Sequence, residues 1–331
     1  MSAAIAVLGA GSWGTALAIQ LARSGRRVVL WGREADGIEE IRRDRVNERY
    51  LPGCPFPDSL EVDGSLERVL ASTDETLIVV PSHALRQLCG AMKAAGAQPA
   101  RLAWATKGLE PETGKLAHEV IAEEFGDIPM AVLSGPTFAM EVGKGLPTAI
   151  TVAGETALAD FFADALHGQR FRAYTSRDIT GVEIGGSAKN VIAIGAGLSD
   201  GLGFGANARV ALITRGLAEI MRLGRALGAQ TETFLGLAGM GDLVLTCTDN
   251  QSRNRRMGLA LAEGKTQEQA HAEIRQVVEG VSAAKEIRRL AQKHAVDMPI
   301  IESIYDVLFE GRDPRDAVES LFERERKPEM C

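Results

Sequence analysis

Lys189 is the residue whose surroundings most suggest chemistry. It follows four small residues, Gly185 to Ala188, in the apolar and glycine-rich stretch GGSAKNVIAIGAG, where burying an unpaired ammonium would be costly. Desolvation and a second cation nearby would lower its pKa toward neutrality, so that the side chain could donate and accept a proton. The alternative is a helix lysine whose ammonium reaches water.

Lys107 and Asp242 are further candidates for the same chemistry. Lys107 lies in ATKGL, just after the apolar run 102–105, and ligands of open α/β sheets bind beyond the carboxyl ends of the strands. An ordinary loop lysine would have the same sequence setting. Asp242 ends the glycine-rich turn LAGMGD, where its carboxylate could hold a lysine ammonium or a substrate hydroxyl.

A phosphate site is predicted around Arg253, in the polar segment TDNQSRNRR at 248–256. The segment has the composition of a helix start, where free N–H groups attract anions, and a guanidinium binds phosphate through two parallel hydrogen bonds. Arg255 and Arg256 are interpreted as a solvated face or as members of internal ion pairs.

A second anion site is predicted at GAGSWG, which matches the pattern G-x-G-x-x-G. The motif follows the predicted strand 4–8 and opens the predicted helix 13–24, as it does in dinucleotide-binding folds. Gly9 permits the tight turn, Gly11 lets the backbone approach a pyrophosphate, and Gly14 allows the helix to pack closely on the sheet.

Arg33 bears on which dinucleotide is bound. The predicted strand 27–31 is followed by Gly32 and Arg33, whereas an NAD site usually has an acidic residue here for the ribose hydroxyls. A guanidinium could instead pair with a 2′-phosphate, which favours NADPH with NADH tolerated. Glu34 follows directly and keeps the NADH alternative open.

The elements that must position these residues change type along the chain. In the first half, short apolar runs alternate with helical patterns, which predicts an α/β fold with a doubly wound Rossmann sheet. After about Gly181 helical periodicity dominates. We therefore expect a dinucleotide-binding domain at 1–180 and an all-α substrate and catalytic domain at 181–331. Further strands are predicted at 76–80, 102–105 and 130–133, and runs at 148–152 and 170–174 could extend the sheet.

Capping patterns predict several helix starts in the second half. Thr266 and Gln269 match a capping box. Ser282 is predicted to cap a helix that runs toward His294. Asp313 before Pro314 predicts the start of the last helix.

Length and composition narrow the class of protein. The chain has 331 residues, enough for two domains, and 45% are hydrophobic, enough for a sizeable core. A net charge of −7 does not suit a nucleic-acid surface. The uncharged N-terminal stretch contains glycines and polar residues and lacks an early basic region, so we predict neither a membrane span nor a signal peptide.

Cysteine and histidine usage indicates a cytoplasmic protein. The four cysteines are scattered without a C-x-x-C pair, and the five histidines form no H-x-x-x-H pair. We expect reduced thiols and no structural metal.

Taken in order, these segments resemble one family. The chain also carries VPSH at 80–83, SGPTFA at 134–139, GMGDL at 239–243 and NQSRN at 250–254. Together the motifs resemble the bacterial NAD(P)-dependent sn-glycerol-3-phosphate dehydrogenases over almost the whole chain. The resemblance implies a Rossmann domain followed by a helical domain like that of 6-phosphogluconate dehydrogenase. It implies reversible reduction of dihydroxyacetone phosphate to sn-glycerol 3-phosphate for phospholipid synthesis, and a homodimer.

The resemblance also implies roles for individual residues, with Lys189 as proton donor and acceptor. Ala188 replaces a larger aliphatic residue that is usual in the family, which could loosen the packing behind Lys189. The residues expected to line the substrate are Lys107, Gly135, Thr137, Lys189, Asp242, Ser252, Arg253 and Asn254. Those expected to contact the cofactor, besides the glycines of the turn, are Ser12, Trp13, Arg33, Tyr50, Lys107, Ala139, Arg253, Val277 and Glu279.

Two other functions are compatible with parts of the sequence. One is a related oxidoreductase that acts on a β-hydroxyacid bearing a carboxylate, which an assay with a non-phosphorylated substrate would detect. The other is a non-catalytic module that senses NADPH. Such a module would not need Lys107, Lys189 and Asp242 together.

Overall fold

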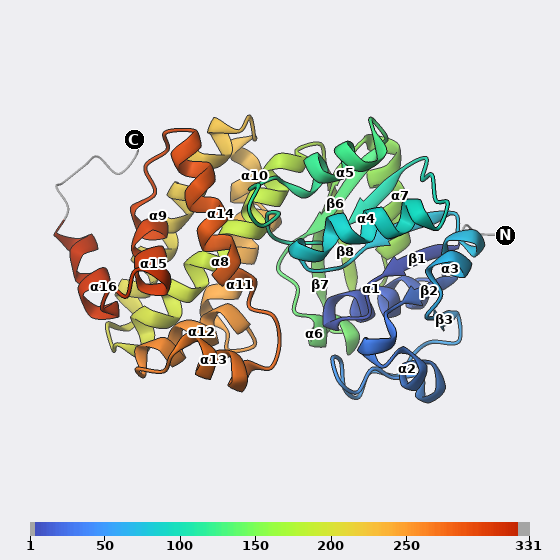
Figure 1. Ribbon diagram of the computed structural model, residues 1–331, viewed down its shortest axis with the longest axis horizontal. Coiled ribbons are helices and arrows are strands. Elements are labelled where there is room, and N and C mark those ends of the chain that lie inside the picture. Colours follow the sequence, from blue (N-terminus) through green and yellow to red (C-terminus); the bar gives the residue numbers. More distant parts are fainter. Residues whose placement is uncertain (1–3, 324–331) are drawn as a thin grey trace.

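The computed structural model describes residues 4–323, and in it a sheet-containing half lies beside a helical half (Figure 1). The sheet has eight strands in the order β3-β2-β1-β4-β5-β6-β7-β8. The strands are β1 (Ile5–Leu8), β2 (Val28–Trp31), β3 (Leu60–Asp63), β4 (Glu75–Ile78), β5 (Leu102–Trp104), β6 (Met130–Ser134), β7 (Thr148–Gly154) and β8 (Phe171–Ser176).

The strand order confirms the doubly wound sheet. All pairings from β3 to β6 are parallel, and their order is that of the Rossmann fold. β7 runs antiparallel to β6, and β8 is parallel to β7, so both extend the sheet as expected. The order reverses between β1 and β4, and a ligand crevice is expected outside their carboxyl ends.

Two apolar cores cover the two faces of the sheet. Along β1, Ile5 and Val7 belong to one core, whereas Ala6 and Leu8 belong to the other, because successive side chains of a strand point to opposite faces. The first core packs against α1 (Ser12–Arg23), α2 (Ile38–Asp44), α6 (Ala139–Gly143) and α7 (Thr156–Leu166), and the second against α3 (Leu66–Ser72), α4 (Leu85–Ala94) and α5 (Ala117–Phe125). Short helical turns follow two strands, η1 (Glu34–Asp36) after β2 and η2 (Ser82–Ala84) after β4.

The helical half is built around α8 (Ile179–Gly201), which is buried along almost its whole length. None of the helices within 4–323 is both long and apolar enough to cross a membrane. Around α8 lie α9 (Gly205–Ala226), α10 (Thr231–Leu235), the π-helical turn η3 (Leu237–Gly241), α11 (Asp242–Thr248), α12 (Arg253–Ala262), α13 (Gln267–Ile274), α14 (Glu279–Lys293), α15 (Pro299–Phe309) and α16 (Pro314–Phe322).

Glycines allow α8 and α12 to pack backbone against backbone. A Cβ atom added to Gly258 of α12 would lie 2.0 Å from the carbonyl oxygen of Ile194. A Cβ atom added to Gly197 of α8 would lie 2.1 Å from the carbonyl oxygen of Arg255. The glycine-rich sequence of α8 is therefore a consequence of close helix packing.

Two of the three predicted helix starts are confirmed. The capping box of Thr266 and Gln269 opens α13, and Asp313 accepts hydrogen bonds from the first turn of α16. The prediction that Ser282 caps a helix is wrong, because α14 begins earlier, at Glu279, and Ser282 lies inside its first turn. A distant side chain supplies part of the cap instead: the Gly280 N–H donates to Oδ1 of Asn254 at 2.9 Å.

The cysteines in the described part of the chain behave as small buried side chains. Cys54, Cys89 and Cys247 are free and buried. Burial raises the pKa of both Cys89 and Cys247 to about 12, which keeps these thiols protonated at neutral pH. Cys331 lies outside the described residues.

Candidate active site

Three charged side chains meet where the sheet joins the helical half, and we refer to Lys107, Lys189 and Asp242 as the charge triad. Lys107 follows β5 and donates to Oδ2 of Asp242 at 2.7 Å. Lys189, in the middle of α8, donates to Oδ1 of the same carboxylate. Lys189 is only 6% exposed and Asp242 1%, so the ion pairs are shielded from water.

Each lysine of the charge triad makes one further hydrogen bond to its surroundings. Lys107 also donates to the carbonyl oxygen of Gly135 at 3.2 Å, and Lys189 donates to Oγ1 of Thr246 at 3.0 Å. The Thr246 hydroxyl in turn donates to the carbonyl oxygen of Asp242, one helical turn earlier in α11. Sequence reasoning missed Thr246, for which the spacing of four residues from Asp242 was the only signal.

Glycines bring three elements together around Lys189. A Cβ atom on Gly185 would lie 2.6 Å from the carbonyl oxygen of Ala238 in η3. A Cβ atom on Gly186 would lie 3.0 Å from Oγ of Ser134, at the end of β6. Close approach on these two sides allows the Lys189 side chain to reach the start of α11 without contact with bulk solvent.

Burial, modified by the other two members of the charge triad, determines the acidity of Lys189. Burial lowers the pKa of Lys189 to about 7, the Asp242 carboxylate opposes that change, and the Lys107 ammonium adds to it. A lysine with a pKa near 7 is present in both protonation states at neutral pH, as a general acid and base requires. The geometry can therefore move a proton to or from an oxygen placed beside the Lys189 ammonium.

The predicted phosphate segment opens α12. Ser252 is the N-cap residue, and its hydroxyl accepts from the Arg255 N–H at 3.2 Å. Asn254 donates through Nδ2 to Oδ1 of Asn190 at 2.8 Å, which joins α12 to α8. Asn190 beside Lys189 thus has a structural partner, and the start of α12 lies next to the lysine-bearing turn of α8.

Arg253 lies against the start of α14. Burial lowers the pKa of Arg253, and Glu279 opposes this change. Burial raises the pKa of Glu279 to about 7, and Arg253 together with Ser82 opposes it. The Ser82 hydroxyl of η2 donates to Oε2 of Glu279 at 3.4 Å, so this pair links the helical half to the sheet. Arg255 instead pairs with Asp200 at 2.6 Å, which confirms its interpretation as a member of an internal ion pair.

The glycine turn after β1 has the shape that a dinucleotide requires. A Cβ atom on Gly9 would lie 2.3 Å from the carbonyl oxygen of Val79, and one on Gly14 would lie 1.9 Å from that of Gly9. A Cβ atom on Gly11 would meet nothing within 4 Å, so the backbone borders open space at the N-terminus of α1. Nε1 of Trp13 is buried and has no hydrogen-bond partner within 4–323. These features fit a pyrophosphate held at the start of α1.

The other residues predicted to bind cofactor or substrate divide between the two halves. Thr137 donates to the carbonyl oxygen of Gly135, and Ala139 begins α6, which lies beside α1. Val277 is exposed just before α14, and Arg33 follows β2, with Tyr50 near it. Within 4–323, no hydrogen bond joins Arg33 or Tyr50 to the charge triad.

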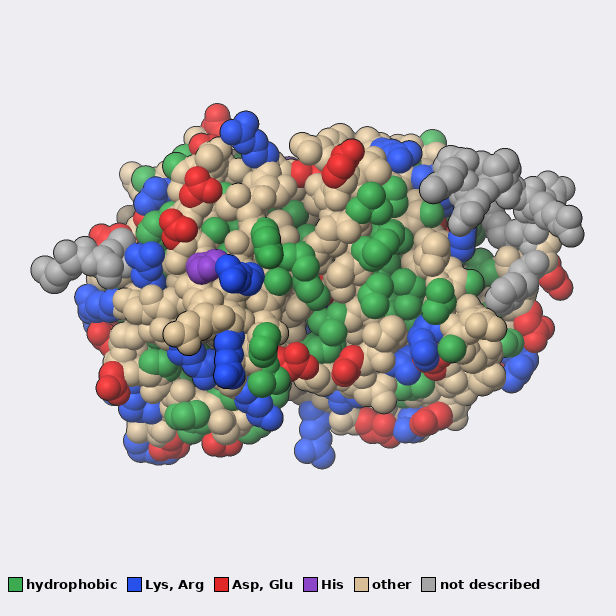
Figure 2. Space-filling view, turned by 180° about the vertical axis from the view of Figure 1, so that it is seen from behind, with side chains coloured by type: hydrophobic (Ala, Val, Ile, Leu, Met, Phe, Trp, Pro, Cys, Tyr) green, Lys and Arg blue, Asp and Glu red, His purple; other side chains and the backbone are tan. Residues whose placement is uncertain are grey.

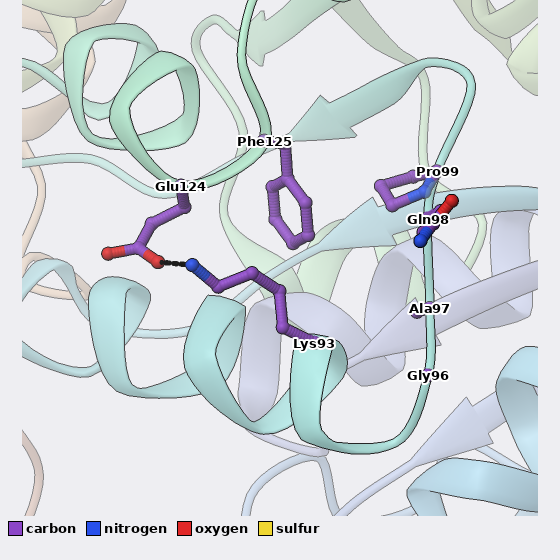
Figure 3. Close-up of a pocket in the computed structure, with 7 residues that line it drawn as sticks. All are labelled: Lys93, Gly96, Ala97, Gln98, Pro99, Glu124 and Phe125. Carbon is purple, nitrogen blue, oxygen red and sulfur yellow. Dashed lines mark ion pairs between the residues drawn. The ribbon is translucent and has the colours of Figure 1, made fainter.

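A surface hollow of about 360 Å³ lies away from these residues (Figure 3). It is formed where α4 and α5 end, before β5 and β6 begin, and thus at the amino ends of these strands. Lys93 and Glu124 form an ion pair in it at 2.5 Å (Figure 3). The hollow shares no residue with the candidate site, which lies beyond the carboxyl ends of the strands.

Comparisons with known proteins agree over both halves of the chain. Models for the N-terminus and the C-terminus of NAD-dependent glycerol-3-phosphate dehydrogenase match residues 4–159 and 178–319. The glycerol-3-phosphate dehydrogenase (NAD(P)+) of Pseudoalteromonas translucida is 57% identical over 331 residues, which cover 99% of each chain. The crystal structure of glycerol-3-phosphate dehydrogenase from Coxiella burnetii has a TM-score of 0.94 at 50% identity, covering 97% of this chain and 99% of that one. The structure of the glycerol-3-phosphate dehydrogenase from Saccharomyces cerevisiae has a TM-score of 0.83 at 27% identity, and the match covers 96% of this chain and 100% of that one.

Proposed function

The chain belongs to the family of NAD-dependent glycerol-3-phosphate dehydrogenases, and from this premise we propose that it reduces dihydroxyacetone phosphate reversibly to sn-glycerol 3-phosphate. The reaction would supply glycerophospholipid biosynthesis. The observation that carries the proposal is the charge triad, in which one carboxylate lies between two lysines and the buried one, Lys189, has a pKa of about 7.

In this proposal Lys189 donates the proton when the ketone is reduced and accepts it in the reverse reaction. When bound, a reduced nicotinamide would supply the hydride for the C2 carbonyl carbon of the substrate. Negative charge grows on the carbonyl oxygen, and the Lys189 ammonium stabilises it and donates the proton. Asp242 orients the ammonium, and Lys107 adds positive charge. Preorganised donors of this kind are often worth ~10²–10³ in rate.

The start of α12 is proposed to hold the substrate phosphate. Arg253 supplies a guanidinium, and the first turn of α12 supplies backbone N–H groups, with Ser252 and Asn254 beside them. The bond between Asn254 and Asn190 supports this assignment, because it ties the phosphate end of the site to the turn of α8 that carries Lys189. A phosphate fixed there would orient the carbonyl toward Lys189.

The cofactor is proposed to lie across the carboxyl ends of β1 and β4. Residues 1–180 would bind the dinucleotide through the Gly9–Gly14 turn, Trp13, Arg33, Tyr50 and Ala139, and residues 181–331 would complete the site with Arg253, Val277 and Glu279. NADPH is the proposed preferred cofactor, because Arg33 follows β2 where a 2′-phosphate would lie, and NADH is the alternative.

A homodimer is proposed as the functional unit. Figure 2 shows apolar side chains gathered over the middle of one face of the molecule. Exposed large apolar residues include Tyr174 on β8, Leu235 on α10 and Val244 on α11. Large exposed apolar patches often mark protein interfaces. Sedimentation of the purified protein across a range of concentrations tests this proposal.

The test of the proposed reaction is a pair of lysine variants. Lys189→Ala should lower kcat for dihydroxyacetone phosphate by ~10²–10³ while leaving the dissociation constant of NADPH nearly unchanged. The matched control is Lys93→Ala, which removes the same side chain from the hollow at the opposite edge of the sheet. Turnover close to that of the unaltered enzyme in Lys189→Ala would refute the role of Lys189. Activity only with a carboxylate-bearing hydroxyacid would refute dihydroxyacetone phosphate as the substrate. Absence of activity with either reduced cofactor would refute the enzymatic function.

A further inference from the structure

Arg33, the residue proposed to meet a 2′-phosphate, is already bound to a carboxylate. Its backbone N–H, Nε and Nη2 donate to Asp36 at 3.1, 3.0 and 3.1 Å. Asp36 ends η1, the turn that follows β2, and its side chain is 18% exposed against 67% for Arg33. Two of the five guanidinium N–H groups are thereby used, and three remain for a ligand.

The charge of a second guanidinium, that of Arg49, acts on the same carboxylate. Nη1 of Arg49 donates to the carbonyl oxygen of Ala35 at 3.4 Å, and its guanidinium carbon lies 4.9 Å from the centre of the Tyr50 ring. Burial acts to raise the pKa of Asp36, but hydrogen bonds from Arg33 and the charges of Arg33 and Arg49 together hold it below its usual value. Asp36 is therefore an anion at neutral pH and faces two cations.

Asn47 fixes the segment that carries Arg49 to the phosphate-binding turn. The buried Nδ2 of Asn47 donates to the carbonyl oxygen of Ala10 and to Oγ1 of Thr15, both at 2.9 Å. Its Oδ1 accepts from the Tyr50 N–H at 3.2 Å. Because the turn binds the pyrophosphate and the end of β2 meets the adenosine ribose in this fold, Arg49 and Tyr50 are held close to the ribose position.

We propose that Asp36 is a specificity-determining residue that limits the preference for NADPH, and that Arg33 and Arg49 are the two cations available to a 2′-phosphate. The inference rests on the proposed use of NAD(P)(H). A phosphate carries about −1.5 to −2 charges, so it is attracted by the two guanidinium groups and repelled by the Asp36 carboxylate. NADH carries no phosphate at this position and does not experience that repulsion. The carboxylate thus weakens NADPH binding selectively and keeps both cofactors in use.

The test compares cofactor binding to Asp36→Asn and to the unaltered protein by isothermal titration calorimetry. With NADPH, the variant should bind ~3–10-fold more tightly at low salt, since one repulsive charge a few ångströms from the phosphate is removed. The gain should shrink as salt screens the site. Binding of NADH should change less than ~2-fold. The fragments 2′,5′-ADP and 5′-ADP should repeat the contrast without any contribution from the nicotinamide end.

Two further variants separate the charge from general surface effects. Asp44→Asn is the matched control, because Asp44 also accepts two hydrogen bonds from an exposed arginine, Arg43, but lies at the end of α2. It should leave both dissociation constants unchanged. Arg49→Ala should weaken NADPH binding by ~3–10-fold and leave NADH binding unaffected.

Either of two results would overturn the inference. Equal changes for NADPH and NADH in Asp36→Asn would mean that the carboxylate has no selective effect. Selective weakening of NADPH binding in Asp36→Asn would mean that Asp36 acts only by orienting Arg33. Both results concern dinucleotide binding, so they are distinguishable from failure of the proposed reaction, which would appear as absence of ketone reduction with either cofactor.

Discussion

Replacing Asp242 by asparagine should shift the pH dependence of ketone reduction in a direction that the charge triad dictates. In the proposed mechanism, reduction uses Lys189 as the ammonium, whose pKa burial has lowered to about 7, so kcat/KM should fall as the pH rises through that value. Asp242 is the group that opposes the lowering. Without its negative charge the ammonium is less stable, and the falling limb of the profile should move to lower pH.

The size of the shift follows from the contact between the charges. Two unit charges about 4 Å apart attract by ~4 kcal/mol at an effective dielectric constant of 20. Since 1.36 kcal/mol corresponds to a factor of ten in the protonation equilibrium, the loss of half of that attraction would lower the protonation equilibrium constant of Lys189 by ~30-fold. The ammonium fraction at pH 7 would then fall from about one half to about 3%, a ~15-fold decrease. Lys107→Met should act in the opposite direction, because Lys107 adds to the lowering of the Lys189 pKa.

The assay is the initial rate of dihydroxyacetone phosphate reduction across the pH range on both sides of neutrality, for the unaltered enzyme and both variants. The substrate phosphate titrates near ~6 in all three reactions and serves as an internal reference. A variant that only damages the site would lower the whole profile and leave its falling limb in place. If the limb stays at the same pH in both variants, Lys189 is not the titrating acid.

Three further substitutions test the phosphate site, the hydrogen bonds from Asn47 to the glycine turn after β1, and the packing of α12 on α8. Arg253→Ala should raise KM for dihydroxyacetone phosphate far more than KM for the cofactor, as rates at varied substrate would show. Asn47→Ala leaves the Thr15 hydroxyl and the Ala10 carbonyl without their partner, so it should cost ~1–3 kcal/mol in thermal unfolding and weaken NADPH binding. Gly258→Ala should destabilise the protein by ~1–3 kcal/mol in urea, because its Cβ would lie 2.0 Å from a carbonyl oxygen of α8. The control Gly90→Ala places a Cβ in open space on α4 and should stabilise by up to ~1 kcal/mol.

The strands were predictable where they form a continuous apolar run, and β3, which does not, was missed. β1 and β2 are continuous apolar runs, and both were predicted within a residue of their bounds. β3, with the sequence LEVD, has only two apolar residues and an exposed Glu61 between them, so its four residues carry too little pattern. The antiparallel direction of β7 was also not predicted, because strand direction depends on pairing with β6 and leaves no periodic signal.

The residues of the site were likewise predictable only where the local sequence marks them. Lys107 and Lys189 are marked by their neighbours, a strand end in one case and a run of small residues in the other. Asn47 contacts residues more than thirty positions earlier in the chain, and nothing in its own segment indicates those contacts. The bond between Arg33 and Asp36 spans only three residues, yet it depends on the turn η1, whose conformation the sequence pattern does not specify.

The acidity of Lys189 is a property of the packing between the two halves of the chain, because the charge triad takes Lys107 from the sheet and its other members from the helices. Glu183 of α8 fixes that packing close to both lysines. Its Oε1 accepts from Nε1 of Trp104 at 3.1 Å and from the His118 N–H at 3.0 Å, so α8 is fastened to β5 and to the first turn of α5. Trp104 lies three residues before Lys107, and Glu183 lies six residues before Lys189. One buried carboxylate therefore holds α8 against β5 near both lysines, although it belongs to neither ion pair of the charge triad.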